Sequence, residues 1–206
     1  MKPIVSASLF ALCFTAAHAN LIQNGGFEVN TNPGANNGID DSADGWTKFT
    51  EFSANSSPDV WDNNGVNGLP PGTSGYFSGF QAYGGTKFAS IAGSPAQNNY
   101  VEGIESSFFN LAANTTYILS AAYAYSGSAP SGYNNAAPIT ARLRMVSFPS
   151  AVLTLLPANS LANTWQTSTY QFQVANAGVY SLILSAEGPV NNYLGVDDVA
   201  LNPVPE

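Results

Sequence analysis

The sequence has 206 residues and a formal net charge of −8, with 45% hydrophobic, 12% aromatic and only 9% charged residues. This length suits one domain, and the charged share lies far below the roughly 25% of an ordinary soluble domain, which excludes a charged coiled coil and a polyelectrolyte tail. Five Lys and Arg against thirteen Asp and Glu make nucleic acid and anionic membranes poor partners, because few cations can neutralise their phosphates.

The first 19 residues have the three parts of a secretory signal peptide. Lys2 precedes an apolar run over residues 4–17, and Ala17-His18-Ala19 is a small-x-small cleavage site. The run is shorter than the ~20 residues that cross a bilayer, and no later window is both long and apolar enough. We therefore expect a protein that is secreted or held at the cell surface, with a mature chain from Asn20 and no membrane insertion.

The predicted signal peptide contains the only cysteine, Cys13, and the only histidine, His18. The mature chain therefore lacks the residues for a Ser-His-Asp or Cys-His nucleophile, a Cys/His zinc site, an iron–sulfur cluster or a disulfide. Carboxylates, hydroxyls, amides and aromatic rings remain. Such an oxygen-rich set favours a hard ion such as calcium.

Residues 20–201 are predicted to form one all-β domain. Apolar and polar residues alternate with a period of two in several windows, whereas no helical period is present. In chain order, the predicted strands are 21–23, 87–92, 104–111, Thr116–Tyr125, Ile139–Met145, Ala151–Leu156, 169–174, 180–184 and 195–201. With about nine or ten short strands separated by loops rich in Gly, Asn, Pro and Ser, the sequence indicates an antiparallel β-sandwich or jelly roll.

Several short motifs follow one another along this domain. The mature chain opens with Asn20-Leu21-Ile22-Gln23-Asn24-Gly25-Gly26-Phe27-Glu28, and later segments are Asp44-Gly45-Trp46, Ala113-Asn114-Thr115-Thr116-Tyr117, Thr164-Trp165-Gln166 and Val196-Asp197-Asp198-Val199-Ala200-Leu201. In order and spacing they resemble carbohydrate-binding modules with the galactose-binding-like jelly roll. The resemblance covers almost the whole mature chain and implies a non-catalytic domain that binds extracellular polysaccharide.

The last residues, Asn202-Pro203-Val204-Pro205-Glu206, resemble the beginning of the Val-Pro-Glu-Pro sorting tail of PEP-CTERM exported bacterial proteins. In that family a transmembrane helix and a basic cluster follow, and this sequence has neither. Residues 202–206 are therefore interpreted as the start of a truncated sorting tail, as the end of a version released without an anchor, or as a plain proline-rich linker.

The resemblance to the carbohydrate-binding modules also implies a structural calcium ion that joins the first strand to the last. In that family the Glu of the opening motif and the first Asp of the closing motif are metal ligands, and these positions are Glu28 and Asp197 here. Backbone oxygens around Asn24 and Gly26 are expected to complete the oxygen ligands that calcium requires.

The alternation of the closing strand is consistent with this calcium site. It places Asp197 on one face with Val199 and Leu201, where an unpaired charge is costly and a cation would relieve the cost. The alternative is that the predicted ligands are solvated carboxylates or pair with Lys48 or Lys87.

A glycan site needs aromatic platforms, because a sugar ring offers an apolar face and a rim of hydroxyls. Trp61 is the first candidate, since its polar neighbours offer no alternating partner to bury it. The secondary candidates are Tyr83, Tyr100, Tyr125 and Tyr133. Trp46 and Trp165 match motif positions that belong mostly to the core of the resembled modules.

Arg142 and Arg144 are further candidates for ligand binding. They share one face of a predicted strand, about 7 Å apart by the strand repeat. They could bind sugar hydroxyls or an acidic polysaccharide, or pair with carboxylates on a solvated face.

Two other functions remain open. One is a matrix or surface protein whose Asn-, Gly- and Tyr-rich loops mediate assembly. The other is an enzyme, either a glycosidase with a carboxyl pair such as Glu102/Glu105 or Asp59/Asp62, or a calcium-dependent terpenoid cyclase with one protonated carboxylic acid in an aromatic pocket. The sequence favours a non-catalytic protein.

Overall fold

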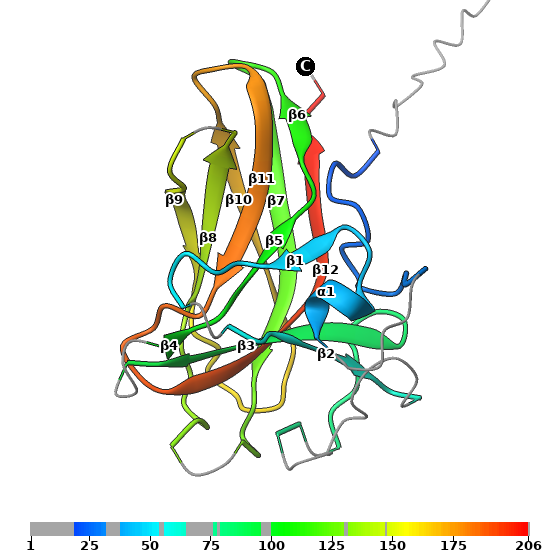
Figure 1. The fold of residues 1–206 in the computed structure, drawn as a ribbon, viewed down its shortest axis with the longest axis vertical. Helices are drawn as coiled ribbons and strands as arrows, with labels where there is room; N and C mark the ends of the chain where they lie inside the picture. Colours follow the sequence, from blue (N-terminus) through cyan, green and yellow to red (C-terminus); the bar gives the residue numbers. More distant parts are fainter. Residues whose placement is uncertain are drawn as a thin grey trace, which may run out of the picture.

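The computed structural model describes residues 19–31, 38–53, 56–64, 76–77, 79–95, 100–129, 132–146 and 148–205. These residues form two antiparallel sheets packed face to face, with one turn of helix, α1 (Ile39–Ser42) (Figure 1). The predicted all-β sandwich is confirmed. The predicted signal peptide lies outside the described residues except for Ala19. Within the described ranges, no helix is long and apolar enough to cross a membrane.

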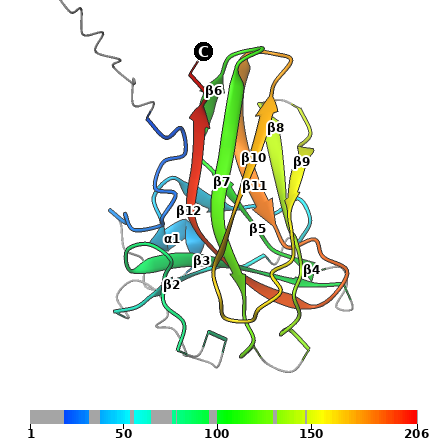
Figure 2. The same ribbon diagram turned by 180° about the vertical axis from the view of Figure 1, so that it is seen from behind.

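Sheet A has the strand order β10-β7-β12-β3-β2, with β4 beside β3. Its strands are β2 (Asp59–Asp62), β3 (Lys87–Ser94), β4 (Tyr100–Val101), β7 (Thr116–Tyr125), β10 (Gln166–Gln173) and β12 (Asn192–Pro203). Sheet B has the order β1-β5-β11-β8-β9, with β6 beside β11. Its strands are β1 (Trp46–Lys48), β5 (Gly103–Ser106), β6 (Phe109–Leu111), β8 (Ile139–Met145), β9 (Ala151–Leu156) and β11 (Gly178–Ser185). Sheet B faces the viewer in Figure 1 and sheet A in Figure 2.

The longer strands lie where the sequence predicts them. Strands β7, β8 and β9 have the predicted bounds, and β3, β10, β11 and β12 contain or overlap the predicted windows. The window 104–111 is divided into β5 and β6, and residues 21–23 form no strand. Strands β1, β2 and β4 were not predicted, because two to four residues are too few to show a period.

One face of each sheet fills the space between the two layers. On β8 and β11, Ile139, Ala141, Leu182 and Leu184 are fully buried in the main core. Their spacing of two is the one predicted for a half-buried antiparallel strand. The opposite faces of the sheets are therefore available to loops or ligands.

The N-terminal segment lies along β12, as the blue and red parts of Figure 1 show. The Leu21 amide donates to the Leu201 carbonyl at 2.9 Å, and the Val199 amide donates to the Gly25 carbonyl at 2.9 Å. The Asn20 side chain adds a hydrogen bond to the Val199 carbonyl at 3.2 Å. The beginning and the end of the domain are therefore side by side, as the sequence predicted, although the first segment is a series of turns.

Gly25 permits this close approach, because a Cβ atom there would lie 1.8 Å from the Val199 carbonyl oxygen. We expect Gly25→Ala to separate the N-terminal segment from β12 and to lower the free energy of unfolding by about 1–3 kcal/mol. Urea unfolding measures the change. Gly84→Ala is the matched control, since a Cβ at Gly84 meets nothing within 4 Å. Equal stability of the two variants would contradict this role of Gly25.

The alternation of β12 is interrupted at Asp198. The expectation that Asp197 shares a face with Val199 and Leu201 is therefore wrong. The pairing of β12 with β7 shifts register between Asp197 and Ala200, and Asp198 has a φ of 47°. An extra residue at a bulge exchanges the two faces of a strand. Val199 and Leu201 therefore belong to the main core, whereas Asp197 lies on the other face with Tyr193 and Gly195, buried there under a loop.

Candidate functional site

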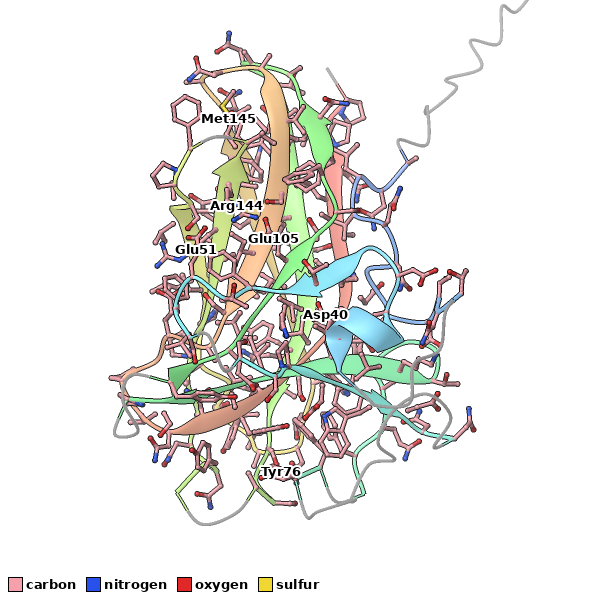
Figure 3. The ribbon with its side chains drawn as sticks, in the orientation of Figure 1. Asp40, Glu51, Tyr76, Glu105, Arg144 and Met145 are labelled. Atoms are coloured by element: carbon pink, nitrogen blue, oxygen red, sulfur yellow. The ribbon has the colours of Figure 1, made fainter. Side chains whose placement is uncertain are left out.

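A cleft of about 320 Å³ opens on the outer face of sheet A, and we call it the tyrosine cleft. It lies towards the end of the sandwich where Tyr76 is labelled in Figure 3. Four tyrosines and two carboxyl side chains contribute to its wall. It is lined by Ser57, Asp59, Tyr76, Ala92, Tyr100, Glu102, Tyr133 and Tyr193.

Adjacent strands of sheet A bring these residues together. Asp59 on β2 is paired with Ser90 on β3, and Ala92 on β3 is paired with Tyr193 on β12. The Glu102 amide, just after β4, donates to the Ala92 carbonyl at 2.8 Å. Because cross-strand partners share a face, all these side chains lie on the outer face of the sheet.

Glu102 is buried in the wall of the cleft, with 3% of its surface exposed. The Ala92 amide donates to Oε2 at 2.7 Å, the Ser57 amide donates to Oε1 at 3.1 Å, and the Tyr100 hydroxyl also donates to Oε1. Burial raises the pKa of Glu102 in spite of these donors, and the charge of Asp59 raises it further. The carboxyl is thus fixed in place, and its negative charge is poorly solvated.

A chain of hydrogen bonds leads from the interior of sheet A to Asp59. Trp61 Nε1 donates to Ser90 Oγ at 2.7 Å, Ser90 Oγ lies 3.4 Å from the Tyr193 hydroxyl, and that hydroxyl donates to Asp59 Oδ2 at 3.0 Å. Burial and the charges of Asp59 and Glu102 raise the pKa of Tyr193, so the phenol stays protonated. The chain orients the ring of Tyr193 in the cleft wall.

An aromatic cluster covers the sheet beside the cleft. Trp61 packs edge-on against Phe77 at 5.3 Å between ring centroids and against Tyr193 at 6.5 Å, and it stacks with Phe88 at 6.3 Å. Trp61 is fully buried in this cluster, so the expectation that no neighbour buries its ring is wrong. Residues 76–80, which are distant in sequence, provide the covering rings. Trp61 therefore packs behind the cleft wall and is not among the residues that line the cleft.

The secondary tyrosine candidates fall in three different places. Tyr100 and Tyr133 line the cleft. Tyr83 is 48% exposed beside Trp165, with 6.1 Å between ring centroids, and lies outside the cleft lining. Tyr125 packs against the main core between the sheets. The structure therefore assembles two of the four with the acidic residues.

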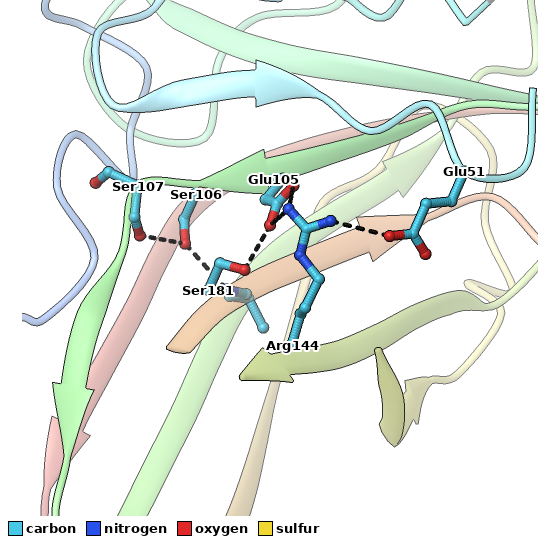
Figure 4. A network of polar contacts seen from close by, with 7 residues as sticks. Glu51, Glu105, Ser106, Ser107, Arg144 and Ser181 are labelled. Carbon is cyan, nitrogen blue, oxygen red and sulfur yellow. Dashed lines mark hydrogen bonds and ion pairs between the residues drawn. The ribbon is translucent and has the colours of Figure 1, made fainter. Parts of the chain in front are cut away.

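Arg142 and Arg144 lie on the outer face of sheet B, away from the cleft. Arg142 Nε donates to Glu187 Oε1 at 2.9 Å, and a second bond joins the same carboxylate. Arg144 Nη1 donates to Glu51 Oε1 at 2.9 Å and pairs with Glu105, which also accepts from Ser181 (Figures 3 and 4). Of the two roles considered for these arginines, the structure shows the pairing with carboxylates.

Neither carboxyl pair considered for a glycosidase comes together. Glu102 faces the cleft on sheet A, whereas Glu105 is paired with Ile183 in sheet B and binds Arg144. Asp59 lines the cleft, whereas Asp62 is buried and accepts a hydrogen bond from the Asn64 amide at 2.7 Å. The carboxyls that share the cleft are Asp59 and Glu102.

Two of the four residues predicted to bind calcium, Glu28 and Asp197, accept hydrogen bonds from residues 83–87. The amides of Tyr83 and Gly84 donate to Asp197 Oδ2 at 2.8 and 3.0 Å, and the amides of Thr86 and Lys87 donate to Glu28 Oε1 at 2.6 Å each. Burial raises the pKa of Asp197 to about 7. A loop therefore joins the first and last segments through two carboxyls, one of them deeply buried.

Gly26 lies between these two carboxyls. A Cβ there would lie 3.8 Å from Asp197 Oδ1 and 3.9 Å from Glu28 Cγ. The Asn24 carbonyl already accepts from the Phe27 amide and from Trp46 Nε1, each at 2.9 Å. Within the described residues no group of three or more His, Cys, Asp or Glu residues gathers as a metal site. A calcium ion would therefore rely on these two carboxylates and on backbone oxygens, and the hard oxygen donors present fit that ion.

Sequence reasoning missed Tyr76, Tyr193 and Ser57 as parts of the cleft and considered Asp59 and Glu102 only in other pairs. The sequence did carry one signal of the cleft. Tyr100 and Glu102 are two residues apart, so they share a face of an extended chain. Tyr76 and Ser57 lie in irregular segments, which carry no such pattern.

No protein-family model matches the sequence, and no curated protein matches it. Solved structures do match the fold. One is a family 61 carbohydrate-binding module, TmCBM61, in complex with β-1,4-galactotriose, with a TM-score of 0.52, 13% identity and coverage of 90% of this chain and 99% of that one. The chain has the jelly-roll fold of such modules.

Two further structures support the same fold. The CBM22-1 xylan-binding domain of Xyn10C from Paenibacillus barcinonensis has a TM-score of 0.54 at 13% identity, over 92% of this chain and 97% of that one. A family 16 carbohydrate-binding module has a TM-score of 0.51 at 19% identity, over 88% of this chain and 99% of that one. The jelly roll predicted from the sequence is thus confirmed.

Proposed function

We propose that the protein is a non-catalytic carbohydrate-binding module that holds an extracellular polysaccharide in the tyrosine cleft. The observation that carries the proposal is the combination of four tyrosines with two fixed carboxyls in one cleft of about 320 Å³. The likeness in fold to structures described as xylan-binding or bound to galactotriose supports it. The signal peptide predicted from residues 1–19 supports a location outside the cell.

The cleft offers both kinds of contact that a sugar ring needs. Tyr100 and Tyr133 are half-buried and can present ring faces to the apolar side of a sugar. Asp59 and Glu102 provide acceptor oxygens for hydroxyl groups at the rim of the ring. Because Glu102 is held by backbone amides and Tyr193 by Asp59, little side-chain freedom is lost on binding.

Binding to soluble xylan and β-galactan oligosaccharides, measured by isothermal titration calorimetry, tests the proposal. We expect Tyr133→Ala to weaken binding about tenfold or more, since it removes a ring from the cleft wall. Tyr83→Ala is the matched control, because Tyr83 is an exposed tyrosine outside the cleft. A loss with Tyr83→Ala and none with Tyr133→Ala would place the site elsewhere on the protein.

The alternatives make different predictions in the same assay. Assembly that depends on protein concentration and not on sugar would favour a matrix protein. Release of reducing ends from the bound oligosaccharide, lost in Glu102→Gln, would favour a glycosidase.

We further propose that Glu28 and Asp197, with the Gly26 carbonyl, hold a structural calcium ion. The buried position of Asp197 supports it, since a divalent ion would compensate a carboxylate that burial otherwise disfavours. The ion would supply charge compensation and a cross-link between the first and last segments.

Chelation tests the calcium proposal. We expect EGTA to lower the melting temperature by several degrees, because a ligand that binds only the folded state stabilises it by RT ln(1 + [L]/Kd). Asp197→Asn should melt at one temperature with and without chelator. Glu187→Gln, on sheet B, is the control and should respond to EGTA as the wild type does. A wild-type melting curve that EGTA leaves unchanged would remove the calcium site.

A further inference from the structure

The tyrosine cleft contains two carboxyls, and none of its lining residues is Lys or Arg. Every cation of residues 20–205 is described, and each lies elsewhere. Lys48 pairs with Asp40, and Lys87 Nζ lies 3.4 Å from the Glu28 carbonyl oxygen. The two arginines pair with carboxylates on sheet B. The formal charge of the cleft wall is therefore wholly negative.

The contacts within the cleft favour the anionic forms of both carboxyls. Glu102 accepts from two backbone amides and a phenol, and Asp59 accepts from the phenol of Tyr193. Burial opposes ionisation and raises the pKa of Glu102, and the charge of Asp59 raises it further. Burial and the charges of both carboxyls raise the pKa of Tyr193. A positive group that entered the cleft would relieve both effects, whereas a negative group would increase them.

The tyrosine rings add a second attraction for a positive group. A cation within about 6 Å of an aromatic ring centre is attracted by the negative face of the ring. Tyr76, Tyr100, Tyr133 and Tyr193 line the same cleft as the two carboxyls. Aromatic rings combined with carboxylates form an environment suited to an ammonium group. The net charge of −8 would also attract a polycation from a distance.

We propose that the ligand of the tyrosine cleft is a glycan with protonated amino groups, of the class of de-N-acetylated 2-amino-2-deoxy sugars. The ammonium group lies between Asp59 and Glu102, and a tyrosine ring stacks on the sugar. This inference rests on the proposed function and specifies its substrate class. Neutral glycans bind more weakly, and polyuronic acids are excluded by charge repulsion.

The test compares β-1,4-linked hexasaccharides that differ in charge with an α-1,4-linked anionic oligosaccharide. Isothermal titration calorimetry is run with glucosamine, N-acetylglucosamine and glucose hexasaccharides and with oligogalacturonate, below the pKa of the sugar amine. We expect the glucosamine hexasaccharide to bind at least about tenfold more tightly than the glucose one, and oligogalacturonate to bind least. The preference should disappear above the pKa of the amine.

Two variants distinguish the effect of a cleft carboxyl on binding from the effect of the protein's net charge. Glu102→Gln and Glu51→Gln each remove one negative charge, but Glu51 lies on sheet B. We expect Glu102→Gln to reduce the preference for glucosamine several-fold and Glu51→Gln to leave it unchanged. Asp59→Asn provides a second cleft variant if Glu102→Gln does not fold. Equal losses with the cleft and the surface variants would overturn the inference.

The outcomes distinguish the inference from the proposed function. Equal affinity for the glucose and glucosamine hexasaccharides, with both lost in Tyr133→Ala, overturns the amino-sugar inference and supports glycan binding. Tightest binding of oligogalacturonate overturns it as well. Absence of binding to every oligosaccharide overturns both.

Discussion

Trp61→Ala is expected to lower the free energy of unfolding by about 3–5 kcal/mol, one of the largest losses that a single substitution can cause in this domain. Trp61 is fully buried and contacts the rings of Phe77, Phe88 and Tyr193. Its removal leaves a cavity under the cleft, and the Ser90 hydroxyl loses the hydrogen bond that it accepts from the indole. Chemical denaturation followed by circular dichroism measures the loss.

Two controls show whether packing causes this loss. Trp61→Phe keeps a ring in the cluster but removes the hydrogen bond to Ser90 and part of the ring volume, so the expected loss is smaller, about 1–2 kcal/mol. Tyr83→Ala removes a ring that is 48% exposed and should change stability by less than about 1 kcal/mol. If Trp61→Ala were as stable as the wild type and still lost glycan binding, Trp61 would have to contact the ligand directly, contrary to its burial.

The ion pair between Arg144 and Glu105 gives the second large effect. The Glu105 side chain is 9% exposed and also accepts a hydrogen bond from Ser181 (Figure 4). Arg144→Met leaves this carboxylate without its cation, so we expect a loss of about 3 kcal/mol in the free energy of unfolding. The double variant Arg144→Met with Glu105→Leu should recover most of the loss, because it removes both charges.

The outer partner of Arg144 provides the matched control. The Glu51 side chain is 47% exposed, and exposed ion pairs contribute about 0–1 kcal/mol. Glu51→Gln should therefore have a small effect that decreases further in high salt. A double variant no more stable than Arg144→Met would show that the unpaired Glu105 carboxylate is not the cause of the loss.

The sequence predicted the long strands well because their patterns are local. Residues 139–145 alternate over seven positions, and residues 116–125 and 151–156 are apolar-rich runs; each forms a strand at the predicted bounds. The juxtaposition of the first and last segments was also predicted, from the motif resemblance. The short strands β1, β2 and β4 depend on their neighbours in the sheets, which a local pattern does not reveal.

Two residues show why the site was harder to predict. Asp197 was assigned to the face of Val199 and Leu201, but the bulge at Asp198 exchanges the faces, and the sequence carries no clear signal for it. Trp61 lies in a polar stretch, yet Phe77 comes from a distant loop to bury it. Both errors concern features that the local alternation does not show: a bulge in β12 and a ring that comes from an irregular segment.

The tyrosine cleft depends on the same kind of long-range contact. Asp59 and Glu102 belong to β2 and to the residue after β4, and β3 between them sets their separation. Tyr193 reaches the cleft from β12, more than ninety positions after Tyr100 in the chain. Only the strand order of sheet A places these side chains around one space.

Amide chemical-shift mapping during an oligosaccharide titration shows whether the tyrosine cleft binds the glycan, because it locates the ligand on the folded protein. We expect the largest shifts at Ser57, Ala92, Tyr100 and Glu102 on the outer face of sheet A, while Arg142 and Arg144 on sheet B are unaffected. Saturable shifts confined to sheet B, or to the exposed ring of Tyr83, would contradict this expectation.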